Sequence, residues 1–206
     1  ASAVLVVFIG LIFFLPFFYT VSPYELNPDA ILLSPSWQYP LGTDRLGRDI
    51  LARVLEGGQT SLIIGFLSAA IASIIGLFIG INAGFFKGNV DKSITVLIDL
   101  FLTFPTFFLL LALVSYIQAS SLVLIIVISI TGWMGMSRMI RSESFAISNK
   151  PYIKILKLAK VNQFKIIFKY FAPLLAPIFL ISFTFSVGGA ILAESGLSFL
   201  GLGINP

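Results

Sequence analysis

The side chains that could do chemistry in this chain are few, and they fall in four places. There is no Cys and no His, which excludes disulfides, thiolate sites and most transition-metal or nucleophile–histidine chemistry. The remaining candidates are an acid–arginine cluster around Asp44, a single Asp99, a single Glu194, and a basic stretch from Arg138 to Lys169. None has the spacing of a catalytic site, and no Walker-type phosphate loop is present, so the sequence predicts a chain that is not itself an enzyme.

The basic stretch from Arg138 to Lys169 holds eight of the thirteen Lys and Arg residues and one acid, Glu143. Asn149 and Pro151 predict the start of a helix inside it, because Asn caps helices and Pro fits the first turn. We expect this helix to run over residues 152–163. A second helical stretch follows, with two further lysines spaced at i, i+4.

The predicted 152–163 helix is amphipathic. One face carries apolar side chains at i, i+3, i+4 and i+7, namely Tyr152, Ile155, Leu156 and Ala159. The opposite side carries Lys154, Lys157 and Lys160, with Ile153 and Val161 as exceptions. Two interpretations stay open on this pattern: a helix lying on anionic lipid with its apolar face down, or a helix whose exposed face fits a groove on another protein.

The elements that position these residues are membrane spans. The chain is 58% hydrophobic and 11% charged, with a mean hydropathy of +1.04, whereas soluble domains carry roughly 25% charged residues. Apolar runs of about 20 residues can cross a bilayer. Five such spans are predicted, at residues 3–20, 60–85, 94–117, 121–139 and 170–192.

Two kinds of residue predict details of these spans. Pro16 is expected to end or kink the first span, and Pro105 to kink the third. Gly76 and Gly80 have the GxxxG spacing that lets membrane helices approach closely. Helix packing and background glycine are both open explanations for that pair.

The distribution of charge predicts the topology. Loops rich in Lys and Arg stay in the cytoplasm, which places segments 86–92 and 138–169 inside and segments 21–58 and 118–120 outside. Ten basic residues are then inside and three outside. Orientation and lipid headgroups account for the net charge of +4, so no nucleic-acid partner is expected.

Four strings resemble the permeases of the dipeptide, oligopeptide and nickel class of ABC importers, in that family's order and spacing. They are LGTDRLGRDIL at 41–51, DLFLTFP at 99–105, the segment from TGW to the arginines at 131–141, and ILAESGLSFLGLG at 191–203. The resemblance implies an all-α polytopic permease fold with five of six spans present. It also implies a missing sixth span after Pro206 and a chain start further upstream.

The domain organisation that follows has three parts. Residues 1–22 form an N-terminally incomplete first span, and residues 23–59 an extracytoplasmic segment. Residues 60–206 form the transmembrane permease core, C-terminally incomplete, with a cytoplasmic coupling loop at 139–170.

In that family the loop between spans four and five holds a coupling helix that docks on an ATPase. Anchoring the pattern on Pro173 puts the family's paired alanines at Ile155 and Leu156 and its glycine at Lys160. The enlarged side chains imply a looser or remodelled contact. The resemblance thus assigns ATPase coupling to Tyr152, Ile155, Leu156, Ala159 and Lys160.

Two further sets of residues have open roles. The cluster of Asp44, Arg45, Arg48 and Asp49 either forms local ion pairs or contributes to an outer gate or receptor contact. The second set comprises Asp99, Glu194, Ser195 and Gly196. Asp99 either lines a polar path or pairs near the cytoplasmic end of its span, while irregular backbone is expected over 193–203, lining the translocation route or packing on a partner.

The predicted function is the permease subunit of an ATP-driven importer of short peptides or of nickel or metal chelates, in the bacterial cytoplasmic (inner) membrane. This chain would bind no cofactor or metal, because ATP and Mg would sit on two cytoplasmic ATPase subunits. The other partners implied are membrane lipid, an extracytoplasmic substrate-binding protein and a second permease chain, giving a heterodimer. The alternatives are an ion-coupled secondary transporter and a scaffold subunit without transport.

Overall fold

The structure is a computed structural model that describes residues 2–116 and 120–203. The described part of the chain is helical, with no strand and a single isolated bridge between Thr43 and Asp49. The all-α prediction is therefore confirmed. The chain divides into two compact units, residues 1–63 and residues 64–205.

The first unit begins with an apolar helix. Helix α1 covers Ser2–Phe14 and runs into the 3-10 turn η1, Leu15–Phe17. The predicted end near Pro16 is confirmed, since Pro cannot continue an α-helical hydrogen-bond ladder. Gln59 Nε2 donates to the Ile12 carbonyl at 2.9 Å, so this helix contacts the beginning of α2.

A loop segment, residues 18–49, follows α1 and contains only the short 3-10 turn η2, Pro28–Ala30. Its path depends on tight turns. Gly47 has a φ of +74°, and a Cβ at this position would overlap the backbone of Asn27. Only glycine combines this left-handed conformation with such a close approach.

Helix α2 covers Ile50–Phe86 and is 37 residues long, so it begins ten residues before the predicted start of the second span at Thr60. Asp49 explains the early start. Its Oδ1 accepts the N–H of Ala52 at 2.8 Å, which satisfies one of the free donors of the first helical turn.

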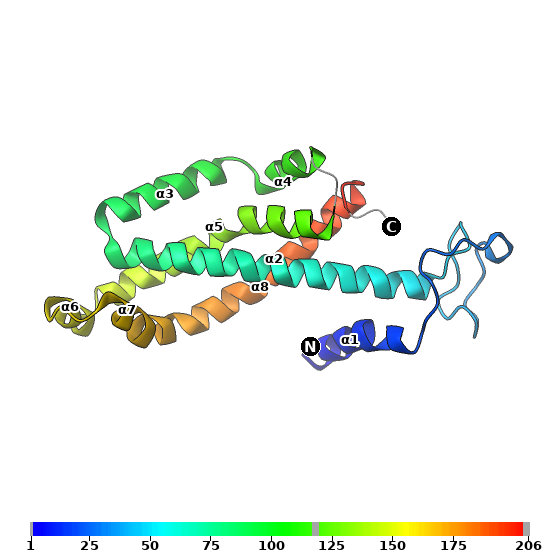
Figure 1. Ribbon diagram of the computed structural model, residues 1–206, viewed down its shortest axis with the longest axis horizontal. Helices are drawn as coiled ribbons and strands as arrows, with labels where there is room; N and C mark the ends of the chain where they lie inside the picture. The colour runs from blue at the N-terminus through cyan, green and yellow to red at the C-terminus, as the bar shows by residue number, and fades with distance from the viewer. Residues whose placement is uncertain (1, 117–119, 204–206) are drawn as a thin grey trace. The chain divides into compact units, whose positions relative to one another are not determined.

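The second unit contains the rest of α2 and the seven elements that follow it among the described residues (Figure 1). Their bounds in chain order are α3 Gly88–Thr103, α4 Thr106–Ser115, α5 Ser121–Ser148, α6 Pro151–Leu158, α7 Gln163–Ile166, the π-helical turn η3 Ile167–Phe171, and α8 Ala172–Phe199. Helices α3 and α4 are bent by 75° relative to one another at the break before Thr106. The predicted kink at Pro105 is confirmed.

The described helices match the second to fifth predicted spans, and match the first only in part. Three continuous segments are long and apolar enough to cross a membrane, and the α3–α4 pair makes a fourth if it counts as one span. The first predicted span corresponds to a shorter apolar helix at Ala3–Phe17. The predicted end of the third span, Ile117, lies outside the described residues. The prediction of irregular backbone over 193–203 was wrong for residues 193–199, because α8 continues through Gly196 to Phe199.

A stripe of glycines joins α2 to α5. A Cβ on Gly76 would lie 2.7 Å from Met136 Cβ, and one on Gly80 would lie 2.7 Å from the Ser137 carbonyl oxygen. The two helices are therefore too close for any larger side chain at these positions. Of the two explanations for the GxxxG spacing, the structure supports helix packing.

Candidate functional site

Helices α6 and α7 form a compact turn between α5 and α8, which we call the elbow (residues 149–171). Figure 1 shows it at one end of the α5–α8 pair. Ile153, Ile166 and Phe171 are fully buried in one cluster with residues of α2, α5 and α8. Because each segment of the elbow places a large apolar side chain in this cluster, the elbow is attached to the helices on either side of it.

Helix α6 ends at Leu158, earlier than the predicted 152–163 helix. The N–H of Val161 donates to the Leu156 carbonyl at 3.1 Å, and the N–H of Lys160 to the Lys157 carbonyl at 3.1 Å. These are the two bonds of a Schellman motif, which closes a helix through a left-handed residue. Lys160 is that residue, with a φ of +54°. The single 152–163 helix was therefore wrong.

The position where the family pattern has glycine is thus the left-handed C-terminal cap of α6. A non-glycine residue in this conformation costs roughly 1–2 kcal/mol, because its Cβ crowds the following carbonyl. Asn162 then begins α7, since its Oδ1 accepts the N–H of Phe164 at 2.9 Å. Lysine in place of the family's glycine at position 160 therefore adds backbone strain as well as a larger side chain.

Lys157, which the helical pattern grouped with Lys154 and Lys160 on one polar side, packs against the end of α2. Its Nζ donates to the Phe85 carbonyl at 2.8 Å and to Ser148 Oγ at 3.1 Å, and lies 3.8 Å from the centre of the Phe85 ring. Burial, with the nearby charge of Lys87, lowers the pKa of Lys157 below its usual value. Lys157 thus ties α6 to the end of α2.

The predicted apolar face of α6 points mostly away from the protein. Ile155 is 63% exposed and Tyr152 41% exposed, whereas Leu156 is half-buried. Leu158, which the face pattern omitted, is 82% exposed. Ile153, treated as an exception on the polar side, is instead the buried anchor. The helix therefore has one apolar side that packs inward and a second apolar surface, made of Tyr152, Ile155, Leu158 and Ala159, that has no cover among the described residues.

Two ion pairs join α3 to α5 beside the elbow. Arg141 binds Asp91 through two hydrogen bonds, one of them 2.8 Å from Nη2 to Oδ2. Arg138 pairs with Asp99, and both side chains are about half exposed. Of the two roles predicted for Asp99, the geometry matches pairing near this end of its span. A bidentate Arg–carboxylate pair also fixes the orientation of the two helices.

The residues predicted to line a translocation route do not gather around one cavity. Glu194 is buried in α8, and Ser198 Oγ donates to its Oε1 at 2.7 Å. Ser195 Oγ lies 3.5 Å from the same carboxylate, and Gly196 faces the Phe107 ring. Asp99, bound to Arg138, has different neighbours. The structure therefore gives these four residues local contacts, and their role in transport stays a prediction.

The acid–arginine cluster lies in the first unit and is largely paired. Asp44 accepts the N–H groups of Leu46 and Arg48 at 2.8 and 3.0 Å and the Arg48 Nε at 2.9 Å. Although desolvation opposes ionisation, these three donors lower the pKa of Asp44 below its usual value. Arg45 remains exposed.

Asp49, the fourth member of that cluster, is almost fully buried. It accepts the hydroxyl of Tyr19 at 2.6 Å in addition to capping α2. Three of the four residues thus have structural contacts, and the predicted outer gate or receptor contact stays a prediction.

Comparison with known proteins places these features in one context. Residues 72–205, well over half of the chain, match the model of the family described as binding-protein-dependent transport system inner membrane component. The oligopeptide transport system permease proteins OppC of Mycobacterium tuberculosis and Mycobacterium bovis are 35% identical over 184 residues, which cover 88% of this chain. A protein of Brucella abortus named as a peptide permease is 32% identical over 191 residues, 93% of this chain. The chain spans 63% of the length of each of these relatives.

Proposed function

Because this chain belongs to the family of inner membrane components of binding-protein-dependent transport systems, we propose that it is a permease subunit of an ATP-driven importer of short peptides. The peptide class is supported by the relatives, whose names describe oligopeptide and peptide permeases. Nickel or a metal chelate is the second substrate class, and rests on the string resemblance alone.

The observation on which the proposal depends is the uncovered apolar surface of α6 on a firmly attached elbow. Isolated apolar side chains on a surface are common, but a contiguous patch on a short helix marks an interaction site. The helix-in-groove mode of recognition uses such a patch at i, i+3 spacing. We assign this surface to the groove of a cytoplasmic ATPase subunit, with the elbow facing the cytoplasm.

The internal side of the elbow supplies the mechanical link. Ile153, Ile166 and Phe171 are fully buried against residues of α2, α5 and α8. A closely packed core transmits displacement because it has no free volume to absorb it. ATP-driven closure of two ATPase subunits would then move α6 as a rigid piece and tilt these helices between inward- and outward-facing states.

The remaining partners follow from the same role. A second permease chain would complete the pathway, and an extracytoplasmic binding protein would deliver substrate. The exposed apolar side chains along the spans, such as Phe185 at 78% and Leu192 at 75%, would face lipid or that second chain. ATP and Mg would be held by the ATPase subunits rather than by this chain.

Co-purification tests the coupling assignment. The double substitution Ile155→Asp and Leu158→Asp places charge on the exposed surface while leaving the buried Ile153 intact. We expect the detergent-solubilised variant to lose its ATPase pair. Trp37→Asp is the matched control, because Trp37 is a fully exposed apolar residue of the 18–49 segment, and it should retain the ATPases.

Two results would contradict the proposal. One is retention of the ATPase pair by the double variant. The other is uptake that survives ATP depletion but collapses with the proton gradient, which would favour the ion-coupled secondary transporter instead. Peptide specificity is tested separately, by competing labelled peptide uptake with unlabelled peptide and with nickel.

A further inference from the structure

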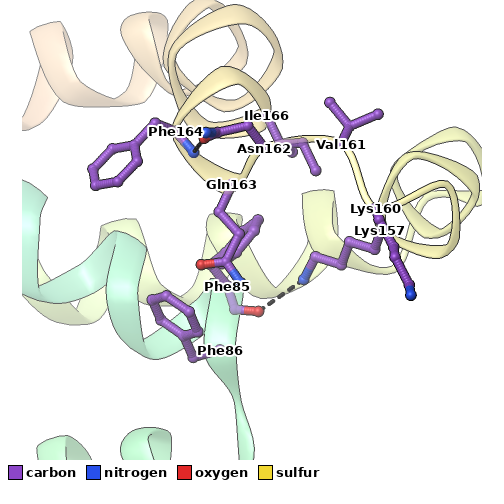
Figure 2. A pocket seen from close by; sticks show the side chains of 9 residues that line it. All are labelled: Phe85, Phe86, Lys157, Lys160, Val161, Asn162, Gln163, Phe164 and Ile166. Carbon is purple, nitrogen blue, oxygen red and sulfur yellow. Dashed lines mark hydrogen bonds between the residues drawn. The ribbon is translucent and has the colours of Figure 1, made fainter.

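A groove of about 600 Å³ lies between the end of α2 and the elbow. This volume is within the range of about 300–1,000 Å³ that small-molecule sites occupy. Figure 2 shows its walls, with Lys157 reaching the Phe85 carbonyl and Lys160 projecting from the turn after α6. The groove is lined by Phe85, Phe86, Lys157, Lys160, Val161, Asn162, Gln163, Phe164 and Ile166.

The chemistry of this groove is that of an anion site. Two lysines and two side-chain amides line it, and none of its nine lining residues is acidic. Lys157 uses two of its three N–H donors on Phe85 and Ser148, which leaves one donor for a ligand. Lys160 also lines the groove and is exposed, so its ammonium is accessible to a ligand there.

The location of the groove indicates what kind of anion it fits. Phe85 and Phe86 are the last residues of one candidate span, and Gln163 is the first residue of another. Positions where spans end lie at the level of lipid headgroups. The two aromatic rings at the rim are exposed, Phe86 by 46% and Phe164 by 73%. Lysines inside the groove and aromatic rings at its edge suit the phosphate group of a lipid, whose acyl chains would lie along the rings.

The backbone at Lys160 gives independent support. This lysine holds a φ of +54°, where a glycine would remove the strain entirely. Residues with strained backbone cluster at ligand-binding and functional sites, and Lys160 lines this groove. Replacing Lys160 by glycine would remove one of the two ammonium groups that line the groove.

We propose that this groove binds the phosphate group of an anionic phospholipid of the surrounding leaflet. The ammonium groups of Lys157 and Lys160 contact the phosphate oxygens, the amides of Asn162 and Gln163 donate to them, and the acyl chains pass Phe86 and Phe164. A bound lipid would join the end of α2 to the elbow. This inference does not depend on the transported substrate or on the ATPase contact.

The test measures lipid binding to the full chain in delipidated detergent, by native mass spectrometry and by the thermal unfolding midpoint. Phosphatidylglycerol should bind and raise the midpoint, because a ligand that binds only the folded state stabilises it. Phosphatidylcholine should do neither at the same concentration. Lys160→Gln should weaken phosphatidylglycerol binding about fivefold, since one basic residue near an anionic surface contributes about 1 kcal/mol.

Two matched variants separate binding from folding. Lys154→Gln removes a charge from the same helix at a position that does not line the groove, and should leave phosphatidylglycerol binding unchanged. Lys160→Gly should raise the midpoint without lipid, by relieving the left-handed strain, and yet lose part of the further rise caused by phosphatidylglycerol. Opposite changes in these two readouts cannot come from misfolding.

Three outcomes would overturn the proposal. Equal weakening by Lys154→Gln and Lys160→Gln would mean that the charge of the helix acts without a site. Inorganic phosphate that displaces phosphatidylglycerol at an equal concentration would make this a site for a soluble anion. Lys160→Gln that reduces ATPase co-purification while leaving phosphatidylglycerol binding intact would assign the groove to a protein interface.

Discussion

The two long connections of this molecule, the 18–49 segment and the elbow, are held in different ways. In the 18–49 segment, polar side chains satisfy the chain's own backbone: Asp44 accepts two N–H groups, and Thr43 Oγ1 accepts the N–H of Leu33 at 2.8 Å. In the elbow, buried apolar residues attach the connection to neighbouring helices. The first connection is held by hydrogen bonds within itself and to the start of α2, whereas the second packs on one side and leaves an apolar surface on the other.

This difference indicates which connection acts on a partner. A segment closed by its own hydrogen bonds is fixed in shape and has little polar capacity left over. A segment attached through a packed core, with a second apolar surface outside, can pass a force from that surface to the helices. The following predictions test that contrast, from the largest expected effect to the smallest.

The largest effect is expected at the buried anchor of α6. Ile153→Ala should lower the free energy of unfolding by about 2–5 kcal/mol, through lost transfer energy and a cavity in a fully packed cluster. Ile155→Ala, on the exposed surface of the same helix, should change it by less than about 0.5 kcal/mol. Chemical denaturation in detergent measures both. Equal effects would show that α6 is not attached through one side.

The corresponding change in the 18–49 segment acts on the backbone. Gly47→Ala should cost about 2–4 kcal/mol, because alanine is strained at a φ of +74° and its Cβ would overlap Asn27. Gly57→Ala is the control: no atom lies within 4 Å of its Cβ position in α2, and the helix gains up to about 1 kcal/mol. Limited proteolysis should detect opening of the segment only in the first variant.

A smaller effect of opposite sign is expected at the end of α6. Lys160→Gly should stabilise the protein by about 1 kcal/mol in the absence of lipid, since glycine adopts the left-handed cap without strain. Lys154→Gly, inside the same helix, should destabilise it by about 1 kcal/mol. Thermal unfolding midpoints of the two variants should therefore move in opposite directions. Movement in the same direction would contradict the cap assignment.

The smallest effect is a pH dependence confined to the 18–49 segment. The pKa of Asp44 is lowered in the folded protein, so its contribution to stability is complete above the unfolded pKa of about 3.9. That contribution is lost as the pH falls through the lower folded value. Asp44→Asn should remove this part of the acid sensitivity, measured by proteolysis of the segment between pH 5 and pH 3. An unchanged pH profile would show that Asp44 does not hold the segment.

Much of the fold could be predicted because the relevant signals are local. Apolar runs located the three continuous candidate spans and the bent α3–α4 pair, and Pro105 located the bend between α3 and α4. Span ends were less accurate, since α2 begins at a cap formed by Asp49 and α5 extends to Ser148. Polar residues continue these helices beyond the apolar window, so hydropathy alone ends them too early.

The candidate site was predicted in outline but not in orientation. Helical spacing correctly grouped Tyr152 with Ile155, yet it grouped the partly buried Lys157 with two exposed lysines and treated Ile153 as an exception. Two apolar surfaces on one short helix produce a pattern that a single amphipathic face cannot describe. Leu158 has the i+3 spacing from Ile155 that could have identified it.

By itself, the sequence determined the membrane class, the approximate spans, the family and the position of the connecting helix, because hydropathy, charge and motif order are properties of neighbouring residues. Only the tertiary structure decided which side of α6 is buried. It also decided the hydrogen bond from Lys157 to the Phe85 carbonyl and the pairing of Arg141 with Asp91. These contacts join residues 72 and 50 positions apart. Such contacts depend on how the helices pack, which no local pattern records.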